Sequence, residues 1–250
     1  MSTAGSPEEE LQTALRHEFR DRSLLERALT HRSWAHEQAE AASETEARRL
    51  HNESMEFVGD SVLGMVVADF LFRRHPDLTE GELSRMKHRL VSTTTLARLS
   101  ERLGIGKHLR FGRGEEKTGG RRKKAILADA YEAVLAAIYL DGGVSAATGF
   151  VHHTLGSDLE SATPEEAAAA DTKTALQELL QAEGRTAPQY DVVESTGPAH
   201  RRTFHVEAVW DAGRVRAEGR TIKAAEMRAA ALAIEQLTNA AQQIAAEAGK

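Results

Sequence analysis

The sequence contains no cysteine, which excludes disulfide bonds and metals bound by thiolates. It also lacks a long apolar run, because the longest, SVLGMVVADFLF at 61–72, is too short to span a membrane and includes Asp69. The first ten residues, MSTAGSPEEE, are acidic and polar, unlike the cationic and apolar start of a signal peptide. From these absences we expect a cytoplasmic protein with neither disulfides nor a membrane-spanning segment.

Positively charged residues are also fewer than negatively charged ones. The 250 residues include 32 Lys and Arg against 38 Asp and Glu, which gives a formal net charge of −6. Taken alone, this balance argues against a nucleic-acid partner. The hydrophobic fraction of 41% and the charged fraction of 28% are those of an ordinary soluble globular protein, and the length suits one large or two modest domains.

Residues 8–158 predict an all-helical domain. Apolar side chains recur every three or four residues through several segments, which glycines and Pro76 separate. The segments are LQTALRHEF, SLLERALTH, MEFVGDSVLGMVVADFLFRR, ELSRMKHRLVSTTTLARLSERLG and AILADAYEAVLAAIYL. The stretch at 112–124, GRGEEKTGGRRKK, is rich in glycine and cations and predicts a loop before the last of them.

The pattern changes after residue 158. Residues 159–170 include Pro164 and an alanine run without apolar periodicity, so they predict a linker that is in part helical. Residues 171–240 predict a small α+β domain of order α-β-β-β-α, in which the first helix ends at Gly184. The second strand alternates, with one face formed by Phe204, Val206, Ala208 and Trp210.

Three acids interrupt an apolar helical segment at HNESMEFVGDSV, residues 51–62. Glu53, Glu56 and Asp60 are spaced i, i+3 and i+7, so they share one helix face, and no Lys or Arg lies within the segment. A solvated face is the ordinary explanation for such spacing. Here the apolar neighbours predict that little of the helix is exposed, and buried carboxylates stay ionised together only beside a cation.

The last helix of the domain repeats this arrangement. Asp129 and Glu132 are the only acids of AILADAYEAVLAAIYL, and their spacing places them on one face. Two such helices packed together would form a site of carboxylate oxygens, which favours Mg²⁺ or Mn²⁺. A di-iron site would need Glu-x-x-His pairs, and no histidine here has a glutamate three residues before it. Divalent ions bound by carboxylates are a common device for hydrolysing phosphodiesters.

These motifs resemble those of a known family. NESMEFVGDSVL followed by ILADAYEAVLAAIYLDGG, with ALTHRSWAHE upstream, resembles the nuclease domain of bacterial ribonuclease III, and the α-β-β-β-α segment resembles its double-stranded-RNA-binding domain. The resemblance implies a homodimeric endonuclease that uses Mg²⁺, with Mn²⁺ as a possible substitute. It also implies that the enzyme cuts both strands of duplex RNA to 5′-phosphate products with short 3′ overhangs, and so processes precursors such as ribosomal and messenger RNA.

The resemblance assigns roles to individual residues. The metal-binding carboxylates fall on Glu56, Asp60, Asp129 and Glu132, the auxiliary acids on Glu53 and Glu80, and a dimer contact on Phe57. The sequence departs from the family pattern at two places. The usual Arg-Leu between the signature glutamates is Ser54-Met55, and a serine common before ILAD is Ala125. Neither departure removes a predicted ligand, so activity is still expected.

By the same resemblance, the second domain contacts duplex RNA at two minor grooves and at the phosphates between them. The implied contact residues are Gln177, Glu178, His200, Arg220 and Lys223. One of the two lysines that the family carries at the start of the last helix is Ile222 here. Residues 171–240 hold 9 Lys+Arg and 10 Asp+Glu, a net charge of −1. We therefore expect RNA binding that is weaker, and that fails at lower salt, than the fold alone suggests.

The location of the positive charges answers in part the objection from the net charge. KTGGRRKK at 117–124 places five positive residues shortly before Asp129, where they either steer the RNA backbone toward the acids or form an ordinary solvated loop. Two other functions stay open: a catalytically inactive relative that binds duplex RNA, and a metal enzyme acting on small phosphorylated substrates. Retention of every predicted ligand argues against the first, and the appended second domain against the other.

Overall fold

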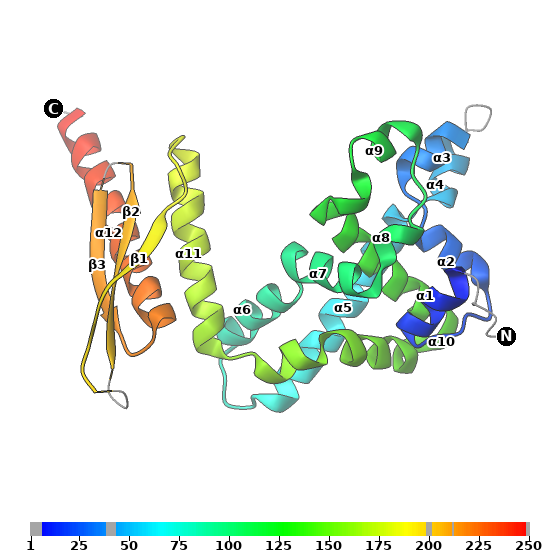
Figure 1. Cartoon of the computed structure of the whole chain (residues 1–250), viewed down its shortest axis with the longest axis horizontal. Helices are drawn as coiled ribbons and strands as arrows, with labels where there is room; N and C mark the ends of the chain where they lie inside the picture. The colour runs from blue at the N-terminus through cyan, green and yellow to red at the C-terminus, as the bar shows by residue number, and fades with distance from the viewer. Residues whose placement is uncertain (1–6, 39–43, 199–201, 212, 249–250) are drawn as a thin grey trace. The chain divides into compact units, whose positions relative to one another are not determined.

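The computed structural model describes residues 7–38, 44–198, 202–211 and 213–248 of the chain (Figure 1). The chain divides into two compact units. The first contains residues 1–78 and 87–161, and the second contains residues 79–86 and 162–250. The described part of the first unit is helical apart from its connections, whereas the second combines helices with a sheet. The predicted fold class, a helical domain followed by a small α+β domain, is confirmed.

The helices before residue 162 follow one another with short connections. They are α1 (Pro7–Leu15), α2 (Arg22–Ala28), α3 (Arg32–Gln38), α4 (Glu44–Leu50), α5 (Glu53–Arg74), α6 (Glu80–Leu90), α7 (Thr93–Leu103), α8 (Ile105–His108), α9 (Arg113–Lys117), the 3₁₀ turn η1 (Gly120–Arg122) and α10 (Lys124–Ser161). The segment predicted as one helix after residue 80 is two helices, because Ser92 caps α7 by accepting a hydrogen bond from the amide of Thr95.

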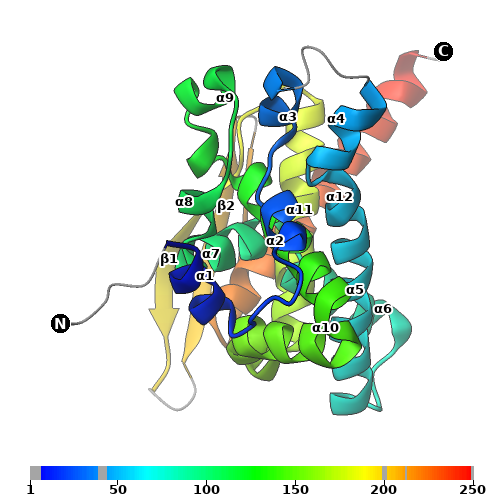
Figure 2. The same ribbon diagram turned by 90° about the vertical axis from the view of Figure 1, so that its right-hand side faces the viewer.

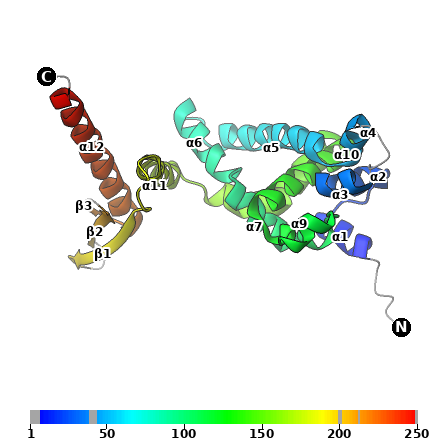
Figure 3. The ribbon, with the colours of Figure 1, turned by 90° about the horizontal axis from the view of Figure 1, so that it is seen from above.

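The core of the first unit lies between α5 and α10, which pack along each other (Figures 2 and 3). Leu63 and Val67 of α5 are fully buried, as are Leu135 and Ile138 of α10. Burying an aliphatic side chain of this size stabilises the fold by roughly 1.5–3 kcal/mol. Because α2 and α7 also pack on α10, this helix is the centre of the unit.

Within the described residues, α10 is the one helix whose length and composition would allow it to cross a membrane. Half of its most apolar window is buried inside the protein, where α5 and α7 cover it. The helical backbone of α10 is also interrupted at Gly143, whose φ of 73° and ψ of −172° are not helical. A glycine is needed there, because side chains rarely adopt this conformation. These are properties of the core helix of a folded domain.

One face of α5 is exposed in the single chain, although its apolar neighbours predicted little exposure. Phe57 is 76% exposed, Met65 48% and Phe72 68%. Their spacing places them on one stripe along the helix. The expectation that the apolar neighbours leave little of this helix exposed is therefore wrong for the single chain. Apolar residues lie on two faces of α5, and only one of these faces is buried against α10.

The prediction of a loop over 112–124 is wrong in part, because α9 and η1 lie within it. Ion pairs inside the stretch explain the difference. Lys123 Nζ lies 2.7 Å from Glu115, and Arg121 donates two hydrogen bonds of 2.8 Å to Glu116. The two glutamates stand in the first turn of α9, where negative charge favours a helix.

The second unit contains a three-stranded antiparallel sheet in the order β1-β2-β3, with α11 and α12 packed together (Figure 3). Its elements are α11 (Pro164–Ala182), β1 (Gln189–Thr196), β2 (Thr203–Trp210), β3 (Gly213–Gly219) and α12 (Ile222–Ala248). The predicted alternation in β2 is confirmed, since Val206, Ala208 and Trp210 are buried. Their face meets the helices in a core made by Leu176, Leu180, Trp210, Ala230, Ala233 and Leu237.

The segment predicted as a linker, 159–170, is mostly helical. It contains the end of α10 and the first two turns of α11, which begins at Pro164. Thr163 caps α11, with its hydroxyl accepting from the amide of Glu166. Proline is favoured at the first position of a helix because its missing N–H would be unpaired there in any case.

Candidate metal centre

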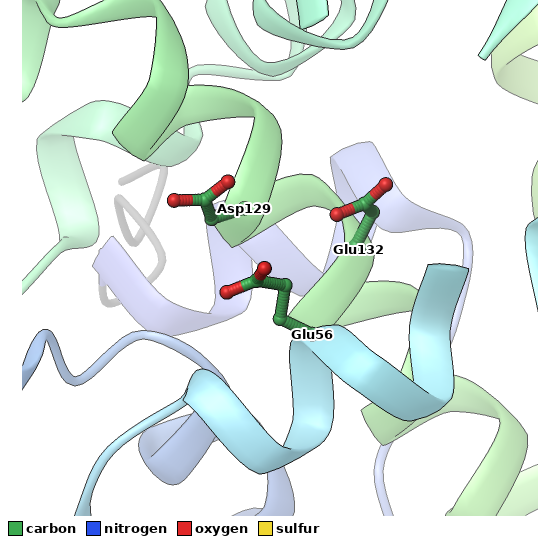
Figure 4. A group of neighbouring side chains, drawn as sticks. All are labelled: Glu56, Asp129 and Glu132. Carbon is green, nitrogen blue, oxygen red and sulfur yellow. The ribbon is translucent and has the colours of Figure 1, made fainter. Parts of the chain in front are cut away.

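Three of the predicted ligands come together in the structure. Glu56 belongs to α5, whereas Asp129 and Glu132 belong to α10 (Figure 4). One carboxylate oxygen of each lies within 4.8 Å of the others, and all three side chains are partly buried. Within the described residues, this is the one group of His, Cys, Asp or Glu side chains with the spacing of a metal site.

The packing of α5 on α10 brings these side chains together. At Gly59 the two helices approach so closely that a Cβ atom would overlap the backbone carbonyl of Glu132. Gly59 therefore sets how near Glu56 comes to the acids of α10. Sequence reasoning missed this residue, although a glycine within an apolar helical segment, directly before Asp60, signals a close backbone approach.

The electrostatics of the group fit a cation among the carboxylates. Burial raises the pKa of the Glu132 carboxyl, and three neighbouring carboxylates add to this, so that it reaches about 8. These neighbours are Asp60, Glu56 and Asp129. Burial also raises the pKa of Glu56 and that of Asp129, with Glu53 contributing to both. Such a group stays fully ionised at neutral pH only beside positive charge, and oxygen donors of this kind suit a hard divalent cation.

The other predicted acids are Asp60 and Glu53 on α5 and Glu80 on α6, and the division of the chain places Glu80 with the second unit. Asp60 is exposed one turn beyond Glu56, and its charge acts on Glu132. Glu53 is half exposed and pairs with Arg32 Nη1 at 3.2 Å. Glu80 begins α6, and its carboxylate accepts a hydrogen bond of 2.7 Å from Ser84. The grouping within 4.8 Å therefore includes neither Glu53, Asp60 nor Glu80.

The predicted RNA-contact residues of the second unit lie on its surface where the structure describes them. Gln177 and Glu178 are exposed on α11, and Arg220 is exposed before α12. Lys223 Nζ lies 2.8 Å from Glu166, so an acid from the first turn of α11 already pairs with it. Ile222 is 41% exposed. His200 lies outside the described residues.

Comparisons with known proteins agree with this architecture. A family model described as Ribonuclease-III-like matches residues 21–159, and one described as a double-stranded RNA binding motif matches residues 172–237. The chain is 47% identical over 223 residues to Ribonuclease 3 of Symbiobacterium thermophilum, and the aligned region covers 88% of this chain and 90% of that protein. It is 46% identical over 209 residues to Ribonuclease 3 of Thermobifida fusca, over 83% and 82% of the two chains.

Solved structures point to the same family. A crystal structure of the nuclease domain of ribonuclease III from Campylobacter jejuni is 32% identical, with a TM-score of 0.54 over 62% of this chain and 97% of that domain. A second structure of that domain, whose subject is flexibility in a region involved in dimer formation, is 34% identical with a TM-score of 0.53, over 60% and 96% of the two chains. The chain belongs to the ribonuclease III family, with a nuclease domain followed by a double-stranded-RNA-binding domain.

Proposed function

We propose that the protein hydrolyses phosphodiester bonds in both strands of double-stranded RNA, leaving 5′-phosphate products with short 3′ overhangs. Its substrates are structured precursors such as ribosomal and messenger RNA. One observation carries the proposal: the three carboxylates from α5 and α10 converge at partly buried positions on the family's fold. A relative that only binds RNA would have no use for partly buried acids that repel one another, where burial and the neighbouring carboxylates together raise the pKa of Glu132 to about 8.

Mg²⁺ is the proposed cofactor, and Mn²⁺ can replace it. The ligands are Glu56, Asp60, Asp129 and Glu132, and Glu53 and Glu80 are auxiliary acids of the catalytic site. When bound, such an ion activates water for attack on the phosphodiester and stabilises the leaving oxygen. Without cysteine, the chain offers no thiolate, and oxygen ligands select hard cations.

The second unit is proposed to hold the duplex. Gln177 and Glu178 face one minor groove, His200 belongs to the turn that enters the next, and Arg220 and Lys223 contact phosphates at the start of α12. The proposed boundaries are 8–158 for the nuclease domain, 159–170 for the connection and 171–240 for the RNA-binding domain. The cytoplasm is the proposed location.

The active form is proposed to be a homodimer with α5 at its seam. The exposed stripe of Phe57, Met65 and Phe72 is larger than scattered surface hydrophobics, and such stripes mark interfaces. A cavity of about 510 Å³ lies on the same helix, lined by residues that include Met65, Phe70 and Val144. In a two-fold contact each copy offers the same surface, so the exposed stripe of one copy would lie against the same face of α5 in the other.

Cleavage of a long RNA duplex with and without Mg²⁺, with the products sized, tests the proposal directly. We expect short duplexes only when the ion is present. Glu132→Ala should abolish cleavage in Mg²⁺ while duplex RNA binding persists. An unchanged cleavage rate in that variant would remove the metal assignment, and absence of cleavage by the parent protein in both Mg²⁺ and Mn²⁺ would favour the inactive RNA-binding relative.

A further inference from the structure

The start of α5 is held from outside the helix. Its N-cap residue, Asn52, makes no capping bond with its own side chain. The Asn52 side chain instead donates to the carbonyl of Ala28 at 3.3 Å, and its backbone N–H donates to the carbonyl of Thr30 at 3.0 Å. The orientation of the first turn of α5 therefore depends on contacts with the end of α2.

Arg27, in the last turn of α2, completes this attachment. Its Nη2 donates a hydrogen bond of 2.6 Å to Ser54 Oγ, and its Nε donates one of 3.2 Å to the carbonyl of His51. The two acceptors stand on either side of Asn52 and Glu53 in the chain. A guanidinium group is planar and rigid, so two bonds from it fix a direction as well as a distance.

The attachment leads to the acid group by a short route. Ser54 follows Glu53 directly and precedes Glu56 by two residues, all within the first turn of a regular helix. On the other side, α2 packs on α10, the helix that carries Asp129 and Glu132. The same short helix thus contacts both helices that carry the carboxylates. Arg27 provides its side-chain hydrogen bond to α5.

We propose that Arg27 is a positioning residue of the metal site, and that it acts through Ser54 and the His51 carbonyl to hold Glu56 in register with Asp129 and Glu132. The departure from the family pattern at Ser54 follows from this, because a serine supplies the acceptor that Arg27 needs. An arginine at 54 would instead place two guanidinium groups together. The inference rests on the proposed metal site and adds a residue that does not touch the ion or the RNA.

A metal-binding measurement on the full chain without RNA tests the proposal, with Mn²⁺ as the probe in titration calorimetry. We expect Arg27→Met to weaken Mn²⁺ binding about tenfold, the usual size for loss of a group that orients metal ligands. Ser54→Ala should weaken it less, because the bond to His51 remains. The double variant should bind no worse than Arg27→Met alone, since both changes break one attachment.

The kinetic signature separates positioning from other roles. Arg27→Met should need more Mg²⁺ for half-maximal cleavage and recover at high Mg²⁺, with the KM for duplex RNA unchanged. Arg98→Met is the matched control, because Arg98 bonds Asp158 at 2.7 Å near the other end of α10. That variant should lose similar thermal stability and bind Mn²⁺ normally.

Two results would overturn the proposal. One is unchanged Mn²⁺ binding in folded Arg27→Met and Ser54→Ala; the other is a raised KM with normal metal binding, which would mean that Arg27 contacts RNA. If Arg27→Met does not fold, Ser54→Ala decides, since it removes a single hydroxyl from an exposed position. Glu132→Ala distinguishes failure of the proposed metal site from failure of the Arg27 proposal. If the metal site is wrongly assigned, Glu132→Ala will cleave RNA normally.

Discussion

Glu132 shows at the scale of one residue how function opposes stability. It lies on the central helix of its unit, beside three other carboxylates, and its pKa of about 8 means that ionisation in the folded chain is unfavourable. An acid whose pKa rises on folding stabilises the fold below its ordinary pKa of about 4.5, and that contribution is lost as the pH rises through 8. The metal-free protein should therefore become less stable over this window.

Glu132→Gln tests this sign. In chelator, we expect the variant to unfold at a higher temperature than the parent protein, by a margin that grows as the pH rises from 5 to 8.5. Mg²⁺ should stabilise the parent protein and not the variant, and the variant should not cleave RNA. Thermal unfolding at each pH is the measurement, with Glu101→Gln on the exposed face of α7 as control. A margin that shrinks with rising pH would contradict the assignment.

Lys223 illustrates a different balance at the residue scale. It is one of two cations proposed to bind phosphates at the start of α12, yet Glu166 lies 2.8 Å from its ammonium group. RNA binding must compete with this ion pair. Pairs as exposed as this one are worth about 0–1 kcal/mol, so the competition is modest and measurable.

Glu166→Gln should therefore tighten duplex RNA binding about two- to fivefold at moderate salt, as expected for an exposed pair. The slope of affinity against salt should steepen, because one more cation becomes available to phosphates. Glu165→Gln is the matched control, since it removes the same charge from the neighbouring residue. The ion pair of Lys223 is with Glu166 and not with Glu165. Equal gains in both variants would show that net charge alone is responsible.

At the scale of the element, two faces of α5 have different roles. One carries Glu56 and packs on α10, and the other exposes Phe57, Met65 and Phe72. The face toward α10 works because Gly59 has no side chain where the helix meets the backbone of Glu132. The same contact therefore sets the helix spacing and the spacing of the carboxylates.

Gly59→Ala should separate the two helices at this contact. Its methyl group meets a backbone carbonyl, which cannot rotate away as a side chain could. We expect a loss of about 1–3 kcal/mol in unfolding free energy, typical of overpacking, and at least a tenfold loss of cleavage, because Glu56 moves away from Glu132. Gly149→Ala on α10 adds its methyl group to open space and should leave both quantities unchanged or slightly improved. Chemical denaturation and an RNA cleavage assay measure the two effects.

At the scale of the whole molecule, the exposed apolar stripe and the charge distribution decide what the protein associates with. The net charge of −6 does not oppose RNA binding uniformly, because positive residues concentrate at 117–124. Within that stretch, Arg121 and Lys123 are paired with acids, which reduces the charge available to RNA. Steering of the RNA backbone by this stretch is therefore weaker than the sequence alone suggests.

Phe57→Glu tests the association of two chains. A charge at the most exposed aromatic of the stripe should shift the protein from dimer to monomer in sedimentation and reduce cleavage of both strands, because a charged group is costly to bury in an apolar contact. Leu232→Glu, at a 44% exposed residue of α12, should leave the association state unchanged. A stable dimer in Phe57→Glu would place the seam elsewhere.

The sequence by itself determined the classes of both domains, the alternation of β2 and the family, because helix and strand periods and two long motifs can be read locally. It also paired Glu56 with Asp129 and Glu132, although they are some seventy residues apart. Only the tertiary structure showed that Gly59 sets the helix spacing and that one face of α5 is uncovered. It alone also showed the hydrogen bond from Arg27 to Ser54 and the ion pair between Glu166 and Lys223. Each depends on which surfaces meet across long stretches of chain, and no local period encodes that.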